Sequence, residues 1–324
     1  METTDQSWKD EYVEKMFGIH STDEEIQSAL ALKDQHIPKY LYKYRAIDDY
    51  DYSLNNFRDD KLWFNLTGEM NDPYDSAFGI DQELFLKKVY KGTGLEDFVH
   101  GHLTNMRKLG IPEDELKESE KELNGTLQEA REMLTNKFEE IKDEILSSLQ
   151  DRTYISCFSE RNDSLLMWSH YTMNHKGFCL EYEFMKPENI ACNPIFKEAL
   201  NPVIYDNKML DMSEYVLHAQ KLKQNWSQRI ISNVIIRKAK DWEYEKEWRL
   251  IQYFPNTEKG YNLGFFKPKA IYLGTKISEK DKAKLMLIAE SKRVDVYQMK
   301  MAQNAFKLIP HPEIIFSNEE TLSN

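Results

Sequence analysis

Two spacings of apolar side chains alternate along this chain, and each change of spacing marks an expected element. Near the N-terminus Trp8, Tyr12 and Met16 recur every four residues, which is the spacing of one helix face. From Lys39 to Arg45 aromatic and basic residues alternate, which is typical of a strand. We therefore expect an N-terminal helical extension over residues 1–38 that packs against the body of the protein.

Short alternating or apolar runs predict the other strands, and longer helical spacings separate them. The expected strands cover residues 62–65, 154–159, 178–184, 203–205, 247–254, 270–273 and 294–299. Helical stretches are expected at about 82–150, at about 208–240 and at 278–291.

Together these elements predict an α+β fold. Its core would be a mixed, largely antiparallel sheet in a single domain over residues 39–310, with helical insertions at about 82–150 and 208–240. Residues 311–324 are expected to form a C-terminal tail.

Charge is concentrated in one of these insertions. Residues 112–150 hold 12 acidic and 5 basic side chains, so they carry −7 of the net charge of −12. A solvated helix face is the favoured interpretation of such a run, and a surface that docks a partner is the alternative.

Composition excludes several classes of protein. With 41% hydrophobic residues the chain can bury a core, and no apolar run approaches the roughly 20 residues that span a membrane. Three cysteines do not form a disulfide framework, and the polar N-terminus lacks the pattern of a signal peptide. We expect a cytoplasmic protein without a broad nucleic-acid-binding surface, because the net charge is negative.

The first two clusters of chemically useful residues lie early in the chain. Arg45 closes an aromatic strand beside Tyr44, and its guanidinium can bind a phosphate or carboxylate with two donors. A structural ion pair is the alternative. The run Asn71-Asp-Pro-Tyr-Asp75 is expected to be a proline turn rather than a metal site.

The third cluster combines Ser156 and Ser159 with Trp168, His170 and Tyr171. A hydrolase triad would fit these residue types, but no Gly-x-Ser-x-Gly motif is present. A zinc site would need more ligands than these residues offer, and a half-buried structural histidine is the simpler alternative.

The fourth cluster is an acidic strand start. If the strand begins at Trp242, then Glu243, Glu245, Glu247 and Arg249 share one face. Carboxylates this close repel one another unless cations or a catalytic role compensate. A Glu-x-Glu pair suits the polarisation of a sugar hydroxyl or the stabilisation of a developing positive charge.

Five motifs occur in an order that resembles a known bacterial family. They are Lys43-Tyr-Arg45, Asn71-Asp-Pro-Tyr-Asp75, Ser156-Cys-Phe-Ser159, Trp168-Ser-His-Tyr171 with His175-Lys-Gly177, and Tyr244-Glu-Lys-Glu-Trp-Arg249. This pattern, over about residues 39–275, resembles domain-of-unknown-function family 2971. The distribution of that family in bacteria and phages implies a role in defence or as a toxin.

More distantly, the order of Arg, Ser and Glu-x-Glu is similar to the ADP-ribosyltransferase fold. That resemblance implies that Arg45 holds a phosphate of NAD, that Ser159 supports the nicotinamide side and that Glu247 stabilises an oxocarbenium-like transition state. Glu245 would meet the acceptor, which could be a protein or a nucleic acid. Further candidates for catalysis or cofactor contact are Tyr44, Tyr171, His170, Ser156, Trp168 and Arg249.

Three functions therefore stay open. The first is ADP-ribosyl transfer or NAD hydrolysis without a metal. The second is a metal-dependent hydrolase or nuclease that uses His170 with Asp72 and Asp75. The third is a non-enzymatic sensor or binding module, in which Arg249 would pair with Glu245 and Arg45 with Asp75.

Overall fold

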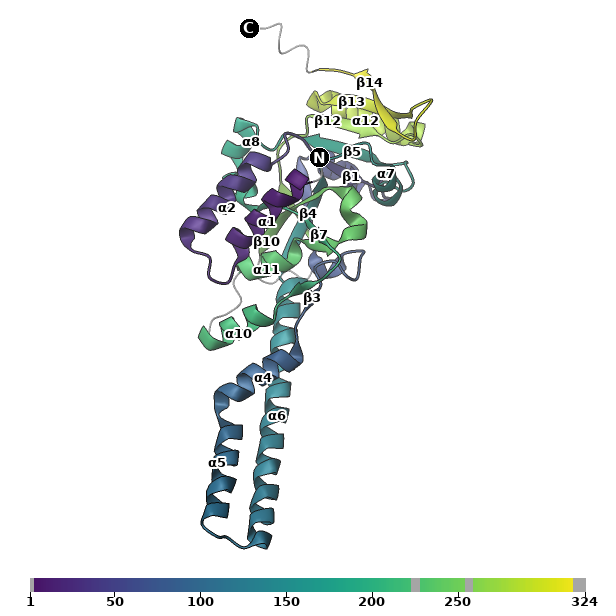
Figure 1. Ribbon diagram of the computed structural model, residues 1–324. Helices are drawn as coiled ribbons and strands as arrows, with labels where there is room; N and C mark the ends of the chain where they lie inside the picture. The colour runs from purple at the N-terminus through teal and green to yellow at the C-terminus, as the bar shows by residue number, and fades with distance from the viewer. Residues whose placement is uncertain (1–2, 223–227, 254–258, 317–324) are drawn as a thin grey trace.

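One large sheet forms the centre of the protein, and a helical arm projects from the sheet (Figure 1). The computed structural model describes residues 3–222, 228–253 and 259–316. The strands are β1 (Leu41–Arg45), β2 (Lys61–Leu66), β3 (Phe78–Gly79), β4 (Thr153–Ser159), β5 (Phe178–Tyr182), β6 (Leu200–Pro202), β7 (Ile204–Asp206), β8 (Leu210–Asp211), β9 (Arg237–Ala239), β10 (Glu247–Tyr253), β11 (Tyr261–Gly264), β12 (Ala270–Leu273), β13 (Asp295–Met301) and β14 (Leu308–Ile314).

The helices cover the sheet or form the arm. They are α1 (Thr3–Phe17), α2 (Asp23–His36), α3 (Tyr52–Arg58), α4 (Gln82–Thr93), α5 (Leu95–Lys108), α6 (Glu113–Gln150), α7 (Leu165–Tyr171), α8 (Pro187–Cys192), α9 (Pro194–Ala199), α10 (Ser213–Leu222), α11 (Gln228–Ile235) and α12 (Glu279–Lys292), with 3-10 turns η1 (Thr67–Glu69) and η2 (Lys240–Glu245).

The main sheet has ten strands in the order β11-β2-β4-β1-β5-β12-β13-β14, with β10 paired to β4 and β6 paired to β10. Only β12 and β13 run parallel within it, so the expected α+β fold with a mixed, largely antiparallel sheet is confirmed. Apolar side chains from both the sheet and its covering helices form the main core.

The N-terminal helices belong to this core. Tyr12 is fully buried and donates a hydrogen bond to Asn201 at 2.7 Å, and Trp8 stacks on Trp248 of β10. Helix α2 begins at a capping box formed by Thr22 and Glu25. Helices α1 and α2 therefore pack against the body, while residues 1 and 2 of the expected extension lie outside the described residues.

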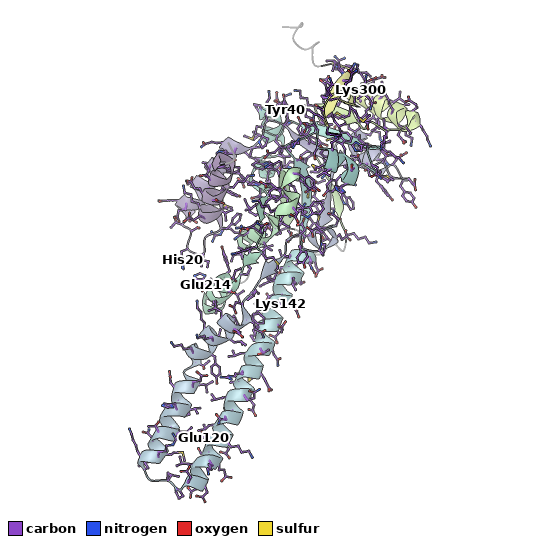
Figure 2. The ribbon with its side chains drawn as sticks, turned by 45° about the vertical axis from the view of Figure 1, so that its right-hand side comes forward. His20, Tyr40, Glu120, Lys142, Glu214 and Lys300 are labelled. Carbon is purple, nitrogen blue, oxygen red and sulfur yellow. The ribbon has the colours of Figure 1, made fainter. Side chains whose placement is uncertain are left out.

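The stretch at 82–150 is helical, but it contains three helices. Gly94, with a left-handed φ of 67°, separates α4 from α5, and a short loop precedes α6. Helix α6 has 38 residues, and in Figure 2 Glu120 lies near the far end of the arm while Lys142 lies closer to the body. Its buried side chains near the body are Phe138, Ile141, Ile145 and Leu149.

Three expectations fail at element boundaries. The helical stretch expected up to residue 240 ends at Ile235, and β9 follows as a partner of β7. The strand expected over residues 247–254 does begin at Glu247, with residue 254 outside the described residues, but the alternative start at Trp242, on which the shared face of Glu243 to Arg249 depended, is wrong because η2 occupies residues 240–245. The tail expected over residues 311–324 is wrong at its start, since β14 pairs with β13 up to Ile314, and residues 317–324 lie outside the described residues.

Within the described residues, no helix is both long enough and apolar enough to cross a membrane.

Candidate active site

A gap in the main sheet creates the candidate site. Along its whole length β4 pairs on one edge with β10. On the other edge it pairs with β1 only at Ser159 and with β2 only at Tyr154 and Ile155. No pairing occurs on that edge for residues 156–158 within the described chain, so β1 and β4 diverge there.

A cleft of about 270 Å³ occupies this gap. Its walls come from β1, β2, β4, α7, β9, η2 and β10, which are distant in sequence. Six of the ten residues singled out from the sequence line it, namely Tyr44, Arg45, Ser156, Tyr171, Glu245 and Glu247. The sheet topology therefore brings the early arginine, the middle serine strand and the late glutamates together.

Buried ion pairs hold the acidic wall of the cleft. The guanidinium of Arg249 binds Asp75 with two hydrogen bonds of 2.7 Å, and its Nε donates to Glu247 at 2.8 Å. The side chains of Arg249 and Asp75 are 0% exposed. The proline turn expected around Asp75 is present, but its last residue is also a deeply buried partner of β10.

Lys238 of β9 completes the cluster. Its ammonium lies 2.6 Å from Glu245 and 3.1 Å from Glu247. Burial alone would raise the pKa of Glu247, but Arg249 and Lys238 outweigh burial and hold that pKa well below its usual range. Glu247 is therefore ionised at neutral pH, with both carboxylate oxygens accepting hydrogen bonds from cations.

Glu245 has a different environment. Burial and the neighbouring charge of Glu247 raise the pKa of Glu245, while Lys238 opposes that shift. Tyr171 of α7 donates a hydrogen bond to its Oε1 at 2.6 Å. Ser159 donates to the backbone carbonyl of Glu245 at 2.6 Å, so this serine positions the acidic turn. Two carboxylates with opposite pKa shifts thus share one wall of the cleft.

Arg45 occupies the wall of the cleft formed by β1. Within the described residues its guanidinium makes no hydrogen bond or ion pair, and burial lowers the pKa of Arg45. A half-buried guanidinium without a carboxylate partner is a ready binding site for an anionic group. The structural pair expected between Arg45 and Asp75 is absent from the described structure, because Asp75 binds Arg249 instead.

Lys43 is a site residue that the sequence reasoning missed. It lines the cleft, and its ammonium lies 2.8 Å from the hydroxyl of Ser156 and 3.0 Å from the carbonyl of Cys157. Burial, assisted by the positive charge of Arg45, lowers the pKa of Lys43 to about 7. Two signals pointed to it, namely the alternation of aromatic and basic residues from Lys39 to Arg45 and its place in the motif Lys43-Tyr-Arg45.

Four predicted site residues lie outside the cleft lining. Trp168 is fully buried and donates its indole N–H to the carbonyl of Asn162. His170 is exposed, and its ring packs edge-on against Trp242. Arg249 and Ser159 are fully buried and support the acidic wall from behind. The pair expected between Arg249 and Glu245 is replaced by Arg249–Glu247 and Lys238–Glu245.

The geometry does not assemble the metal site that the hydrolase alternative requires. Both oxygens of Asp75 accept from Arg249, and His170 faces solvent. No cluster of three or more His, Cys, Asp or Glu side chains suitable for a metal ion occurs in the described parts of the chain.

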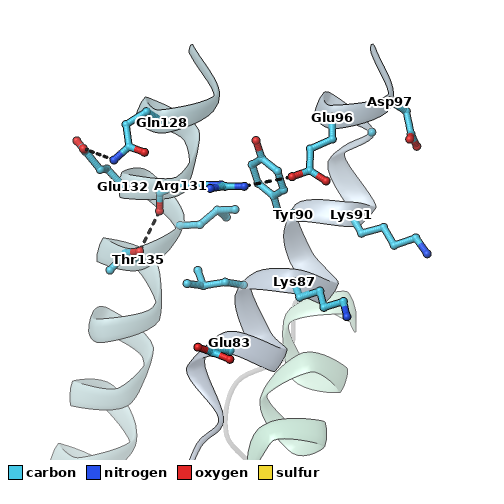
Figure 3. A pocket seen from close by; sticks show the side chains of 13 residues that line it. Glu83, Lys87, Tyr90, Lys91, Glu96, Asp97, Gln128, Arg131, Glu132 and Thr135 are labelled. Carbon is cyan, nitrogen blue, oxygen red and sulfur yellow. Dashed lines mark hydrogen bonds and ion pairs between the residues drawn. The ribbon is translucent and has the colours of Figure 1, made fainter. Parts of the chain in front are cut away.

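A larger cavity of about 580 Å³ lies in the arm, between α4 and α6 (Figure 3). Arg131 crosses it, with its guanidinium over the ring of Tyr90 and 3.2 Å from Glu96. None of the residues singled out from the sequence lines this cavity.

Comparison with known proteins adds one finding at the family level. Residues 167–250 match a family model described as a protein of unknown function, DUF2971. The matched segment contains α7 from its third residue onward, the acidic turn η2 and Arg249, and therefore one side of the cleft. No curated protein and no solved structure matches the chain.

Proposed function

We propose that the cleft binds the nicotinamide–ribose half of NAD, and that the protein transfers ADP-ribose or hydrolyses the dinucleotide. The observation that carries this proposal is the shared cleft, in which Arg45, without an ion-pair partner among the described residues, lies in the same cavity as Glu245 and Glu247. At about 270 Å³ the cavity is near the lower limit for ligand sites, so it suits one half of a dinucleotide.

The charge distribution suits the chemistry of glycosidic cleavage. Departure of nicotinamide leaves positive charge on the ribose, which a fixed carboxylate stabilises more in the transition state than in the ground state. Glu247 is held ionised by its cations and can supply that field. Glu245, with its raised pKa, suits the exchange of a proton with the acceptor or with water.

Arg45→Gln is the most direct test, because Arg45 has no ion pair in the described structure whose loss would destabilise the fold. We expect wild-type protein to release nicotinamide from NAD, with or without cell extract as a source of acceptor. The substitution should reduce kcat/KM by about tenfold to a hundredfold, as expected for a lost charged hydrogen bond of about 1.5–3 kcal/mol.

Glu245→Gln tests the acidic wall, with Glu243→Gln as its matched control. Glu243 lies in the same turn, has a side chain that is 43% exposed, and within the described residues forms an ion pair with Lys246 alone, at 3.5 Å. We expect the first variant to lose at least about a hundredfold in rate and the control to keep full activity. Absence of nicotinamide release from folded wild-type protein under every condition would contradict the proposal.

The ion-pair network supports a second candidate function, a non-enzymatic sensor or binding module. Both oxygens of Glu247 are bound by cations, which is also what a purely structural cluster requires. In that case Glu247→Gln would lower the free energy of unfolding. Neither the wild type nor any variant with a substitution in the cleft would consume NAD.

A further inference from the structure

Lys43 and Ser156 form a hydrogen-bonded pair that the NAD chemistry does not use. Lys43 Nζ lies 2.8 Å from Ser156 Oγ, and the two residues come from strands that diverge at this point. Both side chains line the cleft although each is largely buried. A serine hydroxyl within hydrogen-bond reach of an amine is the arrangement of an activated nucleophile and its base.

A third group fixes the amine. The carbonyl of Cys157 accepts a hydrogen bond from Lys43 at 3.0 Å, and the ammonium lies 5.0 Å from the centre of the Phe158 ring. Within the described chain no carboxylate forms an ion pair with Lys43. The amine is thus held toward Ser156 by neutral groups, which do not force it to stay protonated.

The charged and titratable groups around Lys43 agree with a neutral amine near pH 7. Arg45 on the same strand disfavours its charge, whereas Cys157 on β4 and Glu247 on β10 favour it weakly. Burial is the largest influence and lowers the pKa of Lys43 to about 7. A base with a pKa near the working pH gives the most effective general-base catalysis.

We propose that Ser156 and Lys43 are the nucleophile and general base of an acyl-transfer activity toward small esters or amides that carry a negative charge. Arg45 supplies the selectivity for the anionic group, because its guanidinium lines the same cleft and has no partner in the described structure. This activity goes beyond the reaction with NAD and does not depend on it.

The reaction balances with the groups present. Ser156 Oγ forms a bond to the acyl carbon while its proton passes to Lys43 Nζ. The bond from the acyl carbon to the leaving alcohol or amine then breaks, and Lys43 returns the proton to that leaving group. Water then attacks the serine ester while Lys43 accepts a proton from it, and the bond between the acyl carbon and Ser156 Oγ breaks. Lys43 returns that proton to Ser156 Oγ, which releases the acid and restores both residues, so no oxidant, reductant or metal is required.

A fluorophosphonate probe tests the nucleophile in the wild-type protein, with no variant needed. Peptide mass spectrometry should find the probe on Ser156 and not on Ser159. Ser159 is a matched internal control, because it lies on the same strand but binds a backbone carbonyl rather than an amine. The rate of labelling should rise with pH to a plateau above about pH 7. Absence of label on Ser156, or equal labelling of both serines, would overturn the proposal.

Variants of Lys43 then test whether this residue acts as a general base or only supplies a positive charge. Lys43→Arg keeps a cation and a donor but cannot accept a proton at neutral pH, so labelling should fall by at least about a hundredfold. Circular dichroism and thermal melting identify a variant that has failed to fold, and in that case the pH profile and labelled site of the wild type decide. Labelling of folded Lys43→Arg at the wild-type rate would refute the role of the base.

Two further measurements separate this activity from the reaction with NAD. Glu245→Gln should lose nicotinamide release and keep the labelling of Ser156. Arg45→Gln should slow hydrolysis of p-nitrophenyl hemisuccinate at least tenfold more than that of p-nitrophenyl acetate. Equal slowing of both esters would disprove the selectivity assigned to Arg45. Ester hydrolysis without nicotinamide release would refute only the NAD proposal.

Discussion

Individual buried charges have the largest energetic consequences in this protein. Five ionisable side chains form the acidic wall of the cleft and its buried support, three of them carboxylates and two of them cations. The burial cost of these charges is offset only while every member is present, because removal of one partner leaves another charge desolvated and unpaired. The members are Asp75, Lys238, Glu245, Glu247 and Arg249.

Asp75→Asn should therefore destabilise the fold strongly. It leaves the buried guanidinium of Arg249 with one carboxylate instead of two, which we expect to cost about 3–5 kcal/mol. Asp72→Asn is the matched control in the same turn, since the side chain of Asp72 accepts, within the described residues, a single hydrogen bond, from the backbone of Tyr74 at 2.9 Å. Urea unfolding measures both, and equal stability of the two variants would contradict the structural role of Asp75.

A second prediction at the residue scale concerns Lys33. The direction in which Lys33 changes the stability with pH follows from its pKa. Burial lowers the pKa of Lys33 to about 8, and its ammonium donates to the carbonyls of Lys197 and Glu198, its hydrogen-bond partners in the described parts of the chain. Between about pH 8 and the unfolded pKa of about 10.4 the unfolded chain binds more protons, so the contribution of Lys33 to stability rises with pH.

Lys33→Met removes this titration. Relative to the variant, the wild type should gain about 3 kcal/mol of unfolding free energy between pH 7 and pH 11, at about 1.4 kcal/mol per pKa unit. Lys39→Met is the control and should show no such change. The Lys39 side chain is 68% exposed and lies 3.8 Å from Glu183. Denaturant unfolding at several pH values measures the difference, and parallel curves for wild type and Lys33→Met would contradict it.

At the level of elements, local sequence patterns predict most of the fold but not the assembly of the site. Short alternating or apolar runs located β1, β4, β5 and β10, and the expected helix at 278–291 matches α12, because these elements carry enough apolar residues of their own to be recognised locally. The short strands β3, β6 and β8 have no such pattern and exist only through partners distant in sequence.

The same reasoning explains the outcome at the site. Arg45, Glu245 and Glu247 could be named from their residue types alone. Lys238 could not, because β9 reaches the cleft only by pairing with β7. The ion pairs were assigned to the wrong partners, since a strand beginning at Trp242 would place Glu245 on the face of Arg249, whereas η2 presents Glu245 to Lys238.

The junction between α7 and β5 depends on the absence of a side chain at Gly177. A Cβ there would lie 2.1 Å from the backbone carbonyl of Arg45. We expect Gly177→Ala to destabilise the protein by about 1–3 kcal/mol through overpacking, and to displace β1 at the cleft. Gly125→Ala is the control, because Gly125 lies within α6 with no atom within 4 Å of a built Cβ. It should stabilise by up to about 1 kcal/mol, and thermal melting distinguishes the opposite signs.

At the level of the whole molecule, the arm and the sheet differ in the fraction of their side chains that is buried. The described part of the far half of α6 contributes only Leu116 to the buried set, whereas β4 is buried at six of seven positions. Stability within a protein follows such differences in buried apolar contact.

Hydrogen exchange should reveal this division. Amides of residues 95–130 should exchange at least about a hundredfold faster than those of β4, because the arm can open without disrupting the main core. Raising the salt concentration should slow exchange in the arm, since screening weakens repulsion among its acidic side chains. Uniform protection from arm to sheet would show that the molecule unfolds only as one unit.

The connection between α6 and β4 has a mechanical consequence. The helix is about 57 Å long at 1.5 Å per residue, and only residues 151 and 152 separate it from the strand that carries Ser156. Because two residues allow little independent rotation, we expect the helix and the strand to move together. A force that acts on the tip of the arm would therefore rotate β4, the strand that carries Ser156 in the cleft.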